Sequence, residues 1–283
     1  MTPVPPVDGP DAGAAPEILA MPDGRRLAYH RSRGAVATAA REAGGTPPPG
    51  VVFLGGFRSD MTGTKATFLE ALCAERGLDF LRFDYTCHGA SSGDFETEGR
   101  IGAFAADALD ALDRLTDGPQ VLVGSSMGGW ISLLVARARP GRVAGLIGIA
   151  AAPDFTEDGF WAGFSDAQRA EMAETGRVAL PSEYSDEPYV ITRLLIEDGR
   201  ENLVLRAPLP LPFPVRLLQG TADADVPVDW ALKLLAHAES PDLRLTLVDG
   251  ADHRFSEPRE LAILAATLDE VLGAVATPAA APA

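Results

Sequence analysis

The 283-residue chain has few cysteines and fewer basic than acidic side chains. Its two cysteines, Cys73 and Cys87, are too few for a disulfide framework or a cysteine-ligated zinc site, and we expect both to be buried free thiols. Lys and Arg total 24 against 40 Asp and Glu, which gives a formal net charge of -16. Because that charge repels polyanions, the composition argues against a nucleic-acid-binding protein.

The chain also lacks long uninterrupted apolar runs. Gly, Pro or a charge interrupts each one before it could span a bilayer, and the amino-terminal residues do not combine a basic flank with an apolar core as a signal peptide does. The Pro-, Ala- and Gly-rich ends, residues 1–16 and 276–283, are predicted to be disordered tails. We therefore expect a soluble, cytoplasmic protein without a membrane span, and the sequence leaves its oligomeric state open.

Short apolar runs alternate with amphipathic stretches along most of the chain. GVVFLGGF, DFLRFDY, PQVLVG, VAGLIGIAA, VRLLQG and LRLTLVD are typical of buried strands, and an opening hairpin is expected from EILA and RRLAYHR. Helices are expected between the runs, as at TKATFLEALCAERG. The alternation predicts an α/β core, residues 17–152 and 208–275, in which a mostly parallel sheet has helices on both faces. Its active site should lie at the carboxyl ends of the strands.

Residues 153–207 break this rhythm. Their 55 residues exceed any usual connecting loop, and helical patterns occur around SDAQRAEMAETG and PYVITRLLIEDG. We therefore predict an inserted helical cap, in which most aromatic side chains pack the cap onto the core and the rest line an apolar substrate pocket. The candidates for substrate binding are Phe160, Trp161 and Tyr189.

The stretch VLVGSSMGGW places two serines on a predicted strand-to-helix turn. A nucleophile on such a turn needs small residues two positions away on either side, because strand and helix crowd together there. Ser126 has Gly124 and Gly128 at those positions, whereas Ser125 has Val123 and Met127. The spacing G-x-S-x-G therefore selects Ser126 as the nucleophile.

A nucleophilic serine needs a base, and the chain offers four histidines. On a sheet with this kind of elbow the acid and the histidine follow the serine in the chain, which leaves His237 and His253. His237 lies within a predicted helix, where a surface or packing role is expected. His253 follows the strand LRLTLVD at the carboxyl end of the sheet, so we predict that it is the base. The loop QGTADADVP offers two candidates for the acid, Asp223 and Asp225.

The motifs FLGGF, LRFDYTCHGASSGDF, VGSSMGGW, QGTADADVP and DHR resemble those of α/β-hydrolase serine hydrolases from about residue 50 to residue 264. GTKA, RFDY and GSSMGGW are similar to the branch that includes the mitochondrial acyl-protein thioesterases. The resemblance implies an α/β-hydrolase fold, and the pattern G-x-x-D-x-x-V-P implies that Asp223 is the acid. Asp225 is then a loop carboxylate, either solvated or capping the next helix.

An oxyanion hole is the remaining requirement. One donor is expected to be the backbone N–H of Met127, the residue after the nucleophile, and the second should come from the loop after VVFL. The resemblance implies Phe57 as that second donor, although this chain has Gly55-Gly56 where many relatives have His-Gly. His88, in the segment DYTCHGASSGD, is expected to be a hydrogen-bonded loop residue and not a catalyst.

These residues predict acyl transfer to water through an acyl-enzyme on Ser126. The expected substrate is a small or acylated molecule with a medium or long acyl chain on an ester or thioester. No metal-ligand spacing, phosphate-binding loop or dinucleotide fingerprint occurs in the sequence, so no metal or cofactor is expected. A peptidase on the same fold and a non-catalytic ligand-binding protein are the alternatives.

Overall fold

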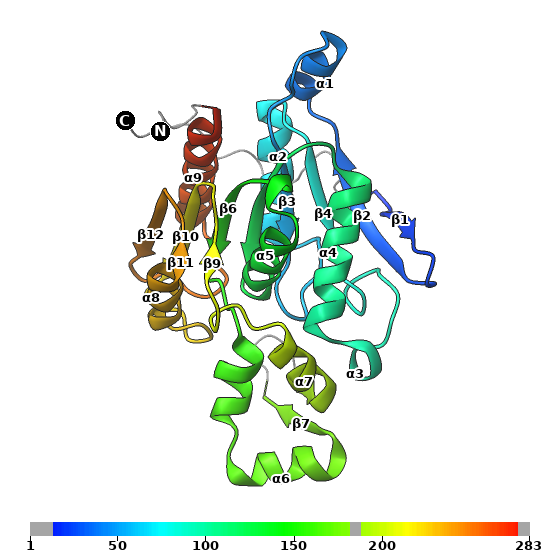
Figure 1. The fold of residues 1–283 in the computed structure, drawn as a ribbon, viewed down its shortest axis with the longest axis vertical. Coiled ribbons are helices and arrows are strands. Elements are labelled where there is room, and N and C mark those ends of the chain that lie inside the picture. Colours follow the sequence, from blue (N-terminus) through cyan, green and yellow to red (C-terminus); the bar gives the residue numbers. More distant parts are fainter. Residues whose placement is uncertain (1–13, 182–187, 277–283) are drawn as a thin grey trace.

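An eight-stranded sheet forms the centre of the computed structural model, which describes residues 14–181 and 188–276 (Figure 1). The strand order is β1-β2-β4-β3-β5-β6-β10-β12. Strand β2 pairs antiparallel with both β1 and β4, and all later neighbours are parallel. The strands are β1 (Glu17–Ala20), β2 (Arg26–Ser32), β3 (Gly50–Leu54), β4 (Phe80–Phe83), β5 (Gln120–Ser125), β6 (Val143–Ile149), β10 (Val215–Gly220) and β12 (Leu243–Val248). The predicted hairpin and mostly parallel sheet are thus confirmed.

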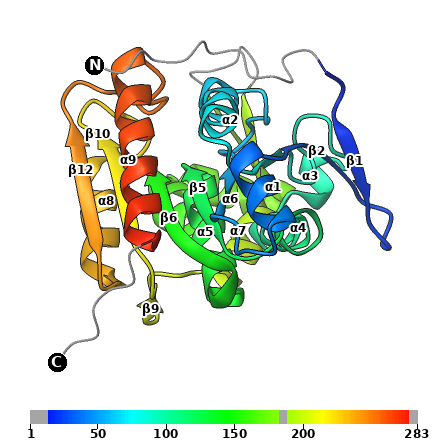
Figure 2. The same ribbon diagram turned by 90° about the horizontal axis from the view of Figure 1, so that it is seen from above.

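Helices cover both faces of the sheet, because successive strand residues point to opposite sides. In β3, Val51 and Phe53 belong to one buried cluster and Val52 and Leu54 to the other. Figure 2 shows the two helical layers on either side of the strands. Helices α2 (Thr64–Arg76) and α9 (Pro258–Ala276) pack in the first cluster, and α4 (Ile101–Leu115), α5 (Met127–Ala138) and α8 (Val228–His237) in the second.

The segment between β6 and β10 folds below the carboxyl ends of the strands in Figure 1. It was predicted to be an inserted helical cap, and besides helices the structure has a two-stranded antiparallel hairpin within it. The second predicted helix begins as a strand, since Tyr-Val-Ile-Thr is a run of aromatic and β-branched residues that favours extended backbone. The elements are η2 (Thr156–Trp161, a π-helix), α6 (Asp166–Thr175), β7 (Arg177–Leu180), β8 (Tyr189–Thr192) and α7 (Arg193–Glu201).

Several short elements were not predicted. They are α1 (Ala35–Glu42), α3 (Phe95–Glu98), η1 (Pro140–Arg142) and the paired short strands β9 (Leu209–Pro210) and β11 (Ala238–Glu239). The predicted insertion boundaries, 152/153 and 207/208, fall between elements. Most of the two predicted tails lies outside the described residues, although α9 runs to Ala276. Within the described ranges, no helix is both long and apolar enough to cross a membrane.

Candidate active site

Ser126 occupies the tight turn between β5 and α5. Its backbone has φ 53° and ψ -117°, a left-handed conformation that costs a non-glycine residue energy, and its N–H donates to the Ile149 carbonyl at 2.9 Å. A Cβ on Gly124 would lie 2.3 Å from the Gly128 carbonyl oxygen, and one on Gly128 would lie 2.0 Å from the Leu54 carbonyl oxygen. No larger side chain fits at either glycine, so the turn has the crowding that a nucleophile elbow imposes.

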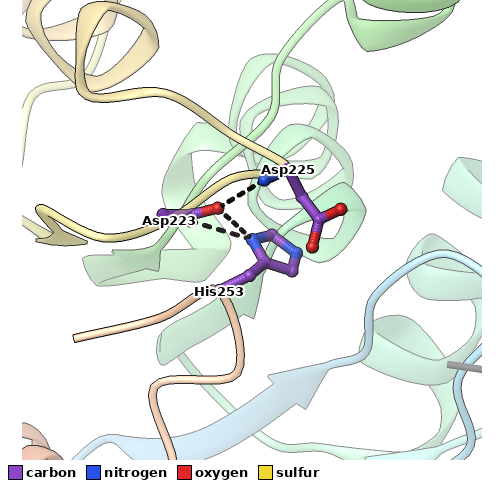
Figure 3. Close-up of side chains that lie close together, drawn as sticks. All are labelled: Asp223, Asp225 and His253. Carbon is purple, nitrogen blue, oxygen red and sulfur yellow. Dashed lines mark hydrogen bonds and ion pairs between the residues drawn. The ribbon is translucent and has the colours of Figure 1, made fainter. Parts of the chain in front are cut away.

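His253 and Asp223 form a hydrogen-bonded pair at the ends of two neighbouring strands. His253 Nδ1 lies 2.9 and 3.1 Å from the two Asp223 carboxylate oxygens (Figure 3). The Asp223 side chain is fully buried and accepts three more hydrogen bonds, from the N–H groups of Asp225 and Val226 and from the Gln219 amide. These donors keep the carboxylate in place, and the carboxylate fixes the proton on Nδ1, which leaves Nε2 as the basic nitrogen.

A cavity of about 710 Å³ brings the predicted nucleophile and base together. Both Ser126 and His253 line it, although no hydrogen bond joins their side chains in the described part of the chain. Catalytic hydrogen bonds often tighten only when substrate binds, so this separation is compatible with a serine-histidine pair. Both apolar and charged side chains line the cavity. The apolar ones include Phe57, Phe155, Phe160, Leu180, Pro181, Tyr189, Val226 and Trp230.

Phe57 joins the predicted oxyanion loop to the inserted segment. Its ring makes edge contacts with Phe95, Phe155, Phe160 and Tyr189, with centroids 5.3 to 5.9 Å apart. Among the described residues, its backbone N–H donates to no other group. The same holds for the N–H of the first residue of α5, where the helix dipole also favours negative charge. Both expected donors are therefore available to a ligand.

His88 supports the turn after Phe57. Its Nε2 accepts from the Arg58 N–H at 3.1 Å, so Nδ1 carries the proton and donates to the Thr86 carbonyl at 3.0 Å. Burial among aromatic rings lowers the pKa of His88 to about 4, which keeps the imidazole neutral and Nε2 free to accept. Arg58 itself has φ 58°, an unfavourable conformation that this hydrogen bond helps to hold. The imidazole of His88, which comes from a different loop, thus hydrogen-bonds to the turn after Gly55-Gly56, where many relatives have His-Gly.

Replacing His88 with Leu should lower kcat by about tenfold to a hundredfold, because a shifted Arg58 peptide misaligns the neighbouring Phe57 donor. Complete loss of one oxyanion donor costs about 10² to 10³. His88→Gln, whose amide oxygen can reach the Nε2 position, is the matched control and should retain most of the activity. Steady-state kinetics with thermal melts checks this, and equal kcat for both variants would contradict the role of the acceptor.

The three predicted substrate-binding aromatics lie in different environments. Phe160 and Tyr189 line the cavity, whereas Trp161 is not among its lining residues in the described chain. The Trp161 ring lies against two guanidinium groups, those of Arg200 at 4.7 Å and Arg169 at 5.6 Å. Trp161 is therefore a correction to the predicted set, because its ring makes cation-π contacts with these arginines and, among the described residues, does not line the cavity.

Asp225 lies beside the imidazole as a second carboxylate (Figure 3). One ligand atom from each of Asp223, Asp225 and His253 lies within 4.8 Å of the others, a grouping that could bracket a metal ion. The Asp223 oxygens already accept from His253 and three further donors, so few of their lone pairs remain for a metal. The hydrogen bonding favours an acid-base pair over a metal centre.

His237, the other candidate base, lies 2.8 Å from the Ala207 carbonyl and is absent from the cavity lining of the described chain.

Sequence reasoning missed several residues of this site. Gln219 was quoted in QGTADADVP without a role, yet its amide donates to Asp223. Trp230 and Leu180 reach the cavity from α8 and β7, and no local signal marks them. Lys65 lines the cavity as well and was noted only within the GTKA motif.

Comparison with known proteins agrees with this architecture. A model of the alpha/beta hydrolase family matches residues 51–264. A Rattus norvegicus protein, named palmitoyl-protein thioesterase ABHD10, mitochondrial, is 36% identical over 261 residues, covering 92% of this chain and 83% of the relative. The structure of mouse alpha/beta hydrolase domain-containing protein 10 has a TM-score of 0.81 at 34% identity, covering 92% of this chain and 99% of that one. A candidate hydrolase from Agrobacterium vitis S4 has a TM-score of 0.83 at 40% identity, covering 91% and 99%.

The relatives' names correct one prediction. They describe mitochondrial proteins, so the expected cytoplasmic localisation is wrong. The features behind that prediction, the make-up of the amino-terminal residues and the interrupted apolar runs, do not distinguish the cytoplasm from the mitochondrial interior. The predicted fold is confirmed: from its family match, its sheet and its similarity to solved structures, the chain belongs to the alpha/beta hydrolase family.

Proposed function

We propose that this protein is a serine hydrolase that cleaves ester or thioester bonds of medium or long acyl groups. The observation that carries the proposal is one cavity whose wall holds both Ser126, on a strained elbow, and His253, paired with the buried Asp223. This is the arrangement that activates a serine hydroxyl in acyl-transfer enzymes.

In the proposed reaction Ser126 Oγ attacks the acyl carbonyl while His253 Nε2 takes its proton. The tetrahedral oxyanion is stabilised by the N–H groups of Phe57 and Met127, and Asp223 stabilises the imidazolium. Collapse of the intermediate breaks the ester or thioester bond, and the leaving alcohol or thiol takes the proton from His253. Water, deprotonated by the same histidine, then releases the fatty acid and restores Ser126. Side chains, backbone, substrate and water account for every bond and proton.

Two observations support an acyl chain of some length. The cavity is lined by several aromatic and aliphatic side chains, and each methylene buried there would contribute about 0.8 kcal/mol. The mammalian relatives carry the name palmitoyl-protein thioesterase. An alcohol or thiol also departs more readily than an amine, which favours esters and thioesters over peptides.

An octanoyl ester should be hydrolysed with a kcat/KM at least about a hundredfold above that of the acetyl ester of the same alcohol. Six further methylenes could contribute roughly 5 kcal/mol if fully buried, and about 2.7 kcal/mol, a little over half of that, suffices for this ratio. The matching octanoyl amide should be a poor substrate. Initial rates with acetyl, butanoyl and octanoyl esters, an octanoyl thioester and the amide provide the test.

Each alternative has its own signature in the same assay. Comparable cleavage of amide and ester would indicate a peptidase, and preference for the acetyl ester would exclude a long acyl pocket. Failure of Ser126 to react with a fluorophosphonate would indicate a non-catalytic ligand-binding protein, because only an activated serine reacts with that probe.

A further inference from the structure

Lys65 links the loop of the predicted base, His253, to helix α2 at the wall of the cavity. It is the second residue of α2, its side chain is half-buried in the cavity lining, and its Nζ donates to the carbonyl oxygen of Arg254, the residue after His253. In the sequence it belongs to the GTKA motif, to which the proposed reaction assigns no role. The contact joins segments 189 positions apart in the chain.

The loop of residues 249–257 is also held by hydrogen bonds from the loop after β10 and by hydrogen bonds within itself. The Ala222 N–H donates to the Ala251 carbonyl at 3.0 Å, and the Phe255 N–H donates to the Asp252 carboxylate at 3.2 Å. Asp223, which follows β10, accepts a hydrogen bond from the imidazole. The bond from Lys65 comes from a different element, α2, and acts on the loop backbone next to the base itself.

We propose that Lys65 is a positioning residue, which holds the backbone of the His253 loop against α2 and so keeps the imidazole aimed at Ser126. The inference rests on the proposed function, because it assigns His253 the role of base. A point charge on a flexible stem suits this task, since the ammonium can reach the carbonyl while its stem packs along the cavity wall.

Charged groups surround the Lys65 ammonium on several elements. Burial lowers its pKa from 10.5 to about 8, the carboxylates of Asp252, Glu260 and Asp223 oppose that shift, and the Arg254 guanidinium adds to it. The charged and titratable groups that line the cavity or act on Lys65 are Arg58 and Asp60 before α2, Tyr189 on β8, Asp223 and Asp225 after β10, Asp252, His253 and Arg254 after β12, and Glu260 on α9.

The direction of this pKa shift sets the pH dependence. A lowered lysine pKa means that the charged form is disfavoured in the folded state, so the charge costs stability below about pH 8 and the cost is relieved as the pH rises toward 10.5. Loss of the proton removes the charge-assisted bond to the Arg254 carbonyl and the attraction to Asp252 and Glu260. Activity should therefore fall as the pH rises through about 8, while stability does not.

The test compares Lys65→Met with Lys65→Arg in the full-length protein. Lys65→Met should lower kcat about tenfold, leave KM for an octanoyl ester within about twofold, remove the decline in rate near pH 8 and leave Tm at pH 7 unchanged or higher. Lys65→Arg keeps a donor whose charge persists at high pH. It should recover most of kcat and sustain it above pH 8.

Hydrogen-deuterium exchange of residues 249–257 separates this inference from the proposed function. Faster exchange of that segment in Lys65→Met, with Lys65→Arg close to the wild type, is the expected result whether or not the enzyme turns over. Unchanged exchange overturns the inference, as does a Lys65→Met variant that keeps the wild-type kcat and decline near pH 8. Equal damage in both variants with a lowered Tm would show a merely structural lysine. Failure of the wild type to hydrolyse esters would instead overturn the proposed function.

Discussion

Ser126→Ala should abolish ester hydrolysis and covalent labelling by a fluorophosphonate, with a loss in kcat of about 10⁶, as expected when a nucleophile is removed from a serine hydrolase. Ser125→Ala should remain active and should still be labelled. The reason is geometric: both serines line the cavity, but Ser126 sits on the strained turn, whereas Ser125 is the last residue of β5 and only 6% exposed.

Intact mass and peptide mapping of the labelled protein provide the measurement. The Ser125→Ala variant is the matched control, since it removes one hydroxyl from the adjacent position of the same turn. A probe adduct on Ser125, or strong residual labelling of Ser126→Ala, would show that the elbow has been assigned to the wrong serine.

His253→Ala and Asp223→Asn should each lower kcat by about 10⁴, the loss associated with a disabled base or a base in the wrong tautomer. An asparagine at residue 223 can turn its NH₂ group toward His253, which would move the imidazole proton to Nε2 and leave no basic nitrogen toward the serine. Circular dichroism and Tm would check that both variants remain folded.

Asp225→Asn is the matched control for the acid. Asp225 lies beside the imidazole, but its side chain is exposed. The hydrogen bonds to the Asp223 carboxylate, in contrast, hold Asp223 against His253. We expect a change in kcat of less than about tenfold. Equal losses at the two aspartates, or a loss confined to Asp225→Asn, would transfer the role of acid to Asp225.

The sequence was informative wherever chemistry and local pattern coincide. Alternating apolar runs and helical periodicity predicted the sheet, because they reflect burial of strands between two helical layers. The glycines on either side of Ser126 marked the elbow, since the close approach of α5 to β5 and β3 admits no Cβ there. The catalytic roles of Ser126, Asp223 and His253 stay predictions until the variants are measured.

Contacts between distant segments were beyond the reach of local patterns. The bond from Lys65 on α2 to the Arg254 carbonyl and that from Arg58 to His88 join segments far apart in the chain, and no spacing in the sequence encodes them. The local sequence also cannot decide what Trp161 contacts. An aromatic residue in the insertion can face the cavity or a pair of arginines with the same local sequence. The strand β8 was missed where β-propensity outweighed an apparent helical period.

Phe57 has a consequence for how the enzyme would choose among substrates. Its backbone N–H is an expected oxyanion donor, and its ring packs against Phe155, Phe160 and Tyr189 in the wall of the acyl cavity. In the proposed reaction this one residue would contact both the reacting carbonyl and the hydrocarbon chain. An acyl chain that fills the cavity would press on the ring and steady the donor, whereas a short one would leave the ring unsupported. Because this discrimination between acyl chains would act in the transition state, chain length would change the turnover rate as well as the affinity.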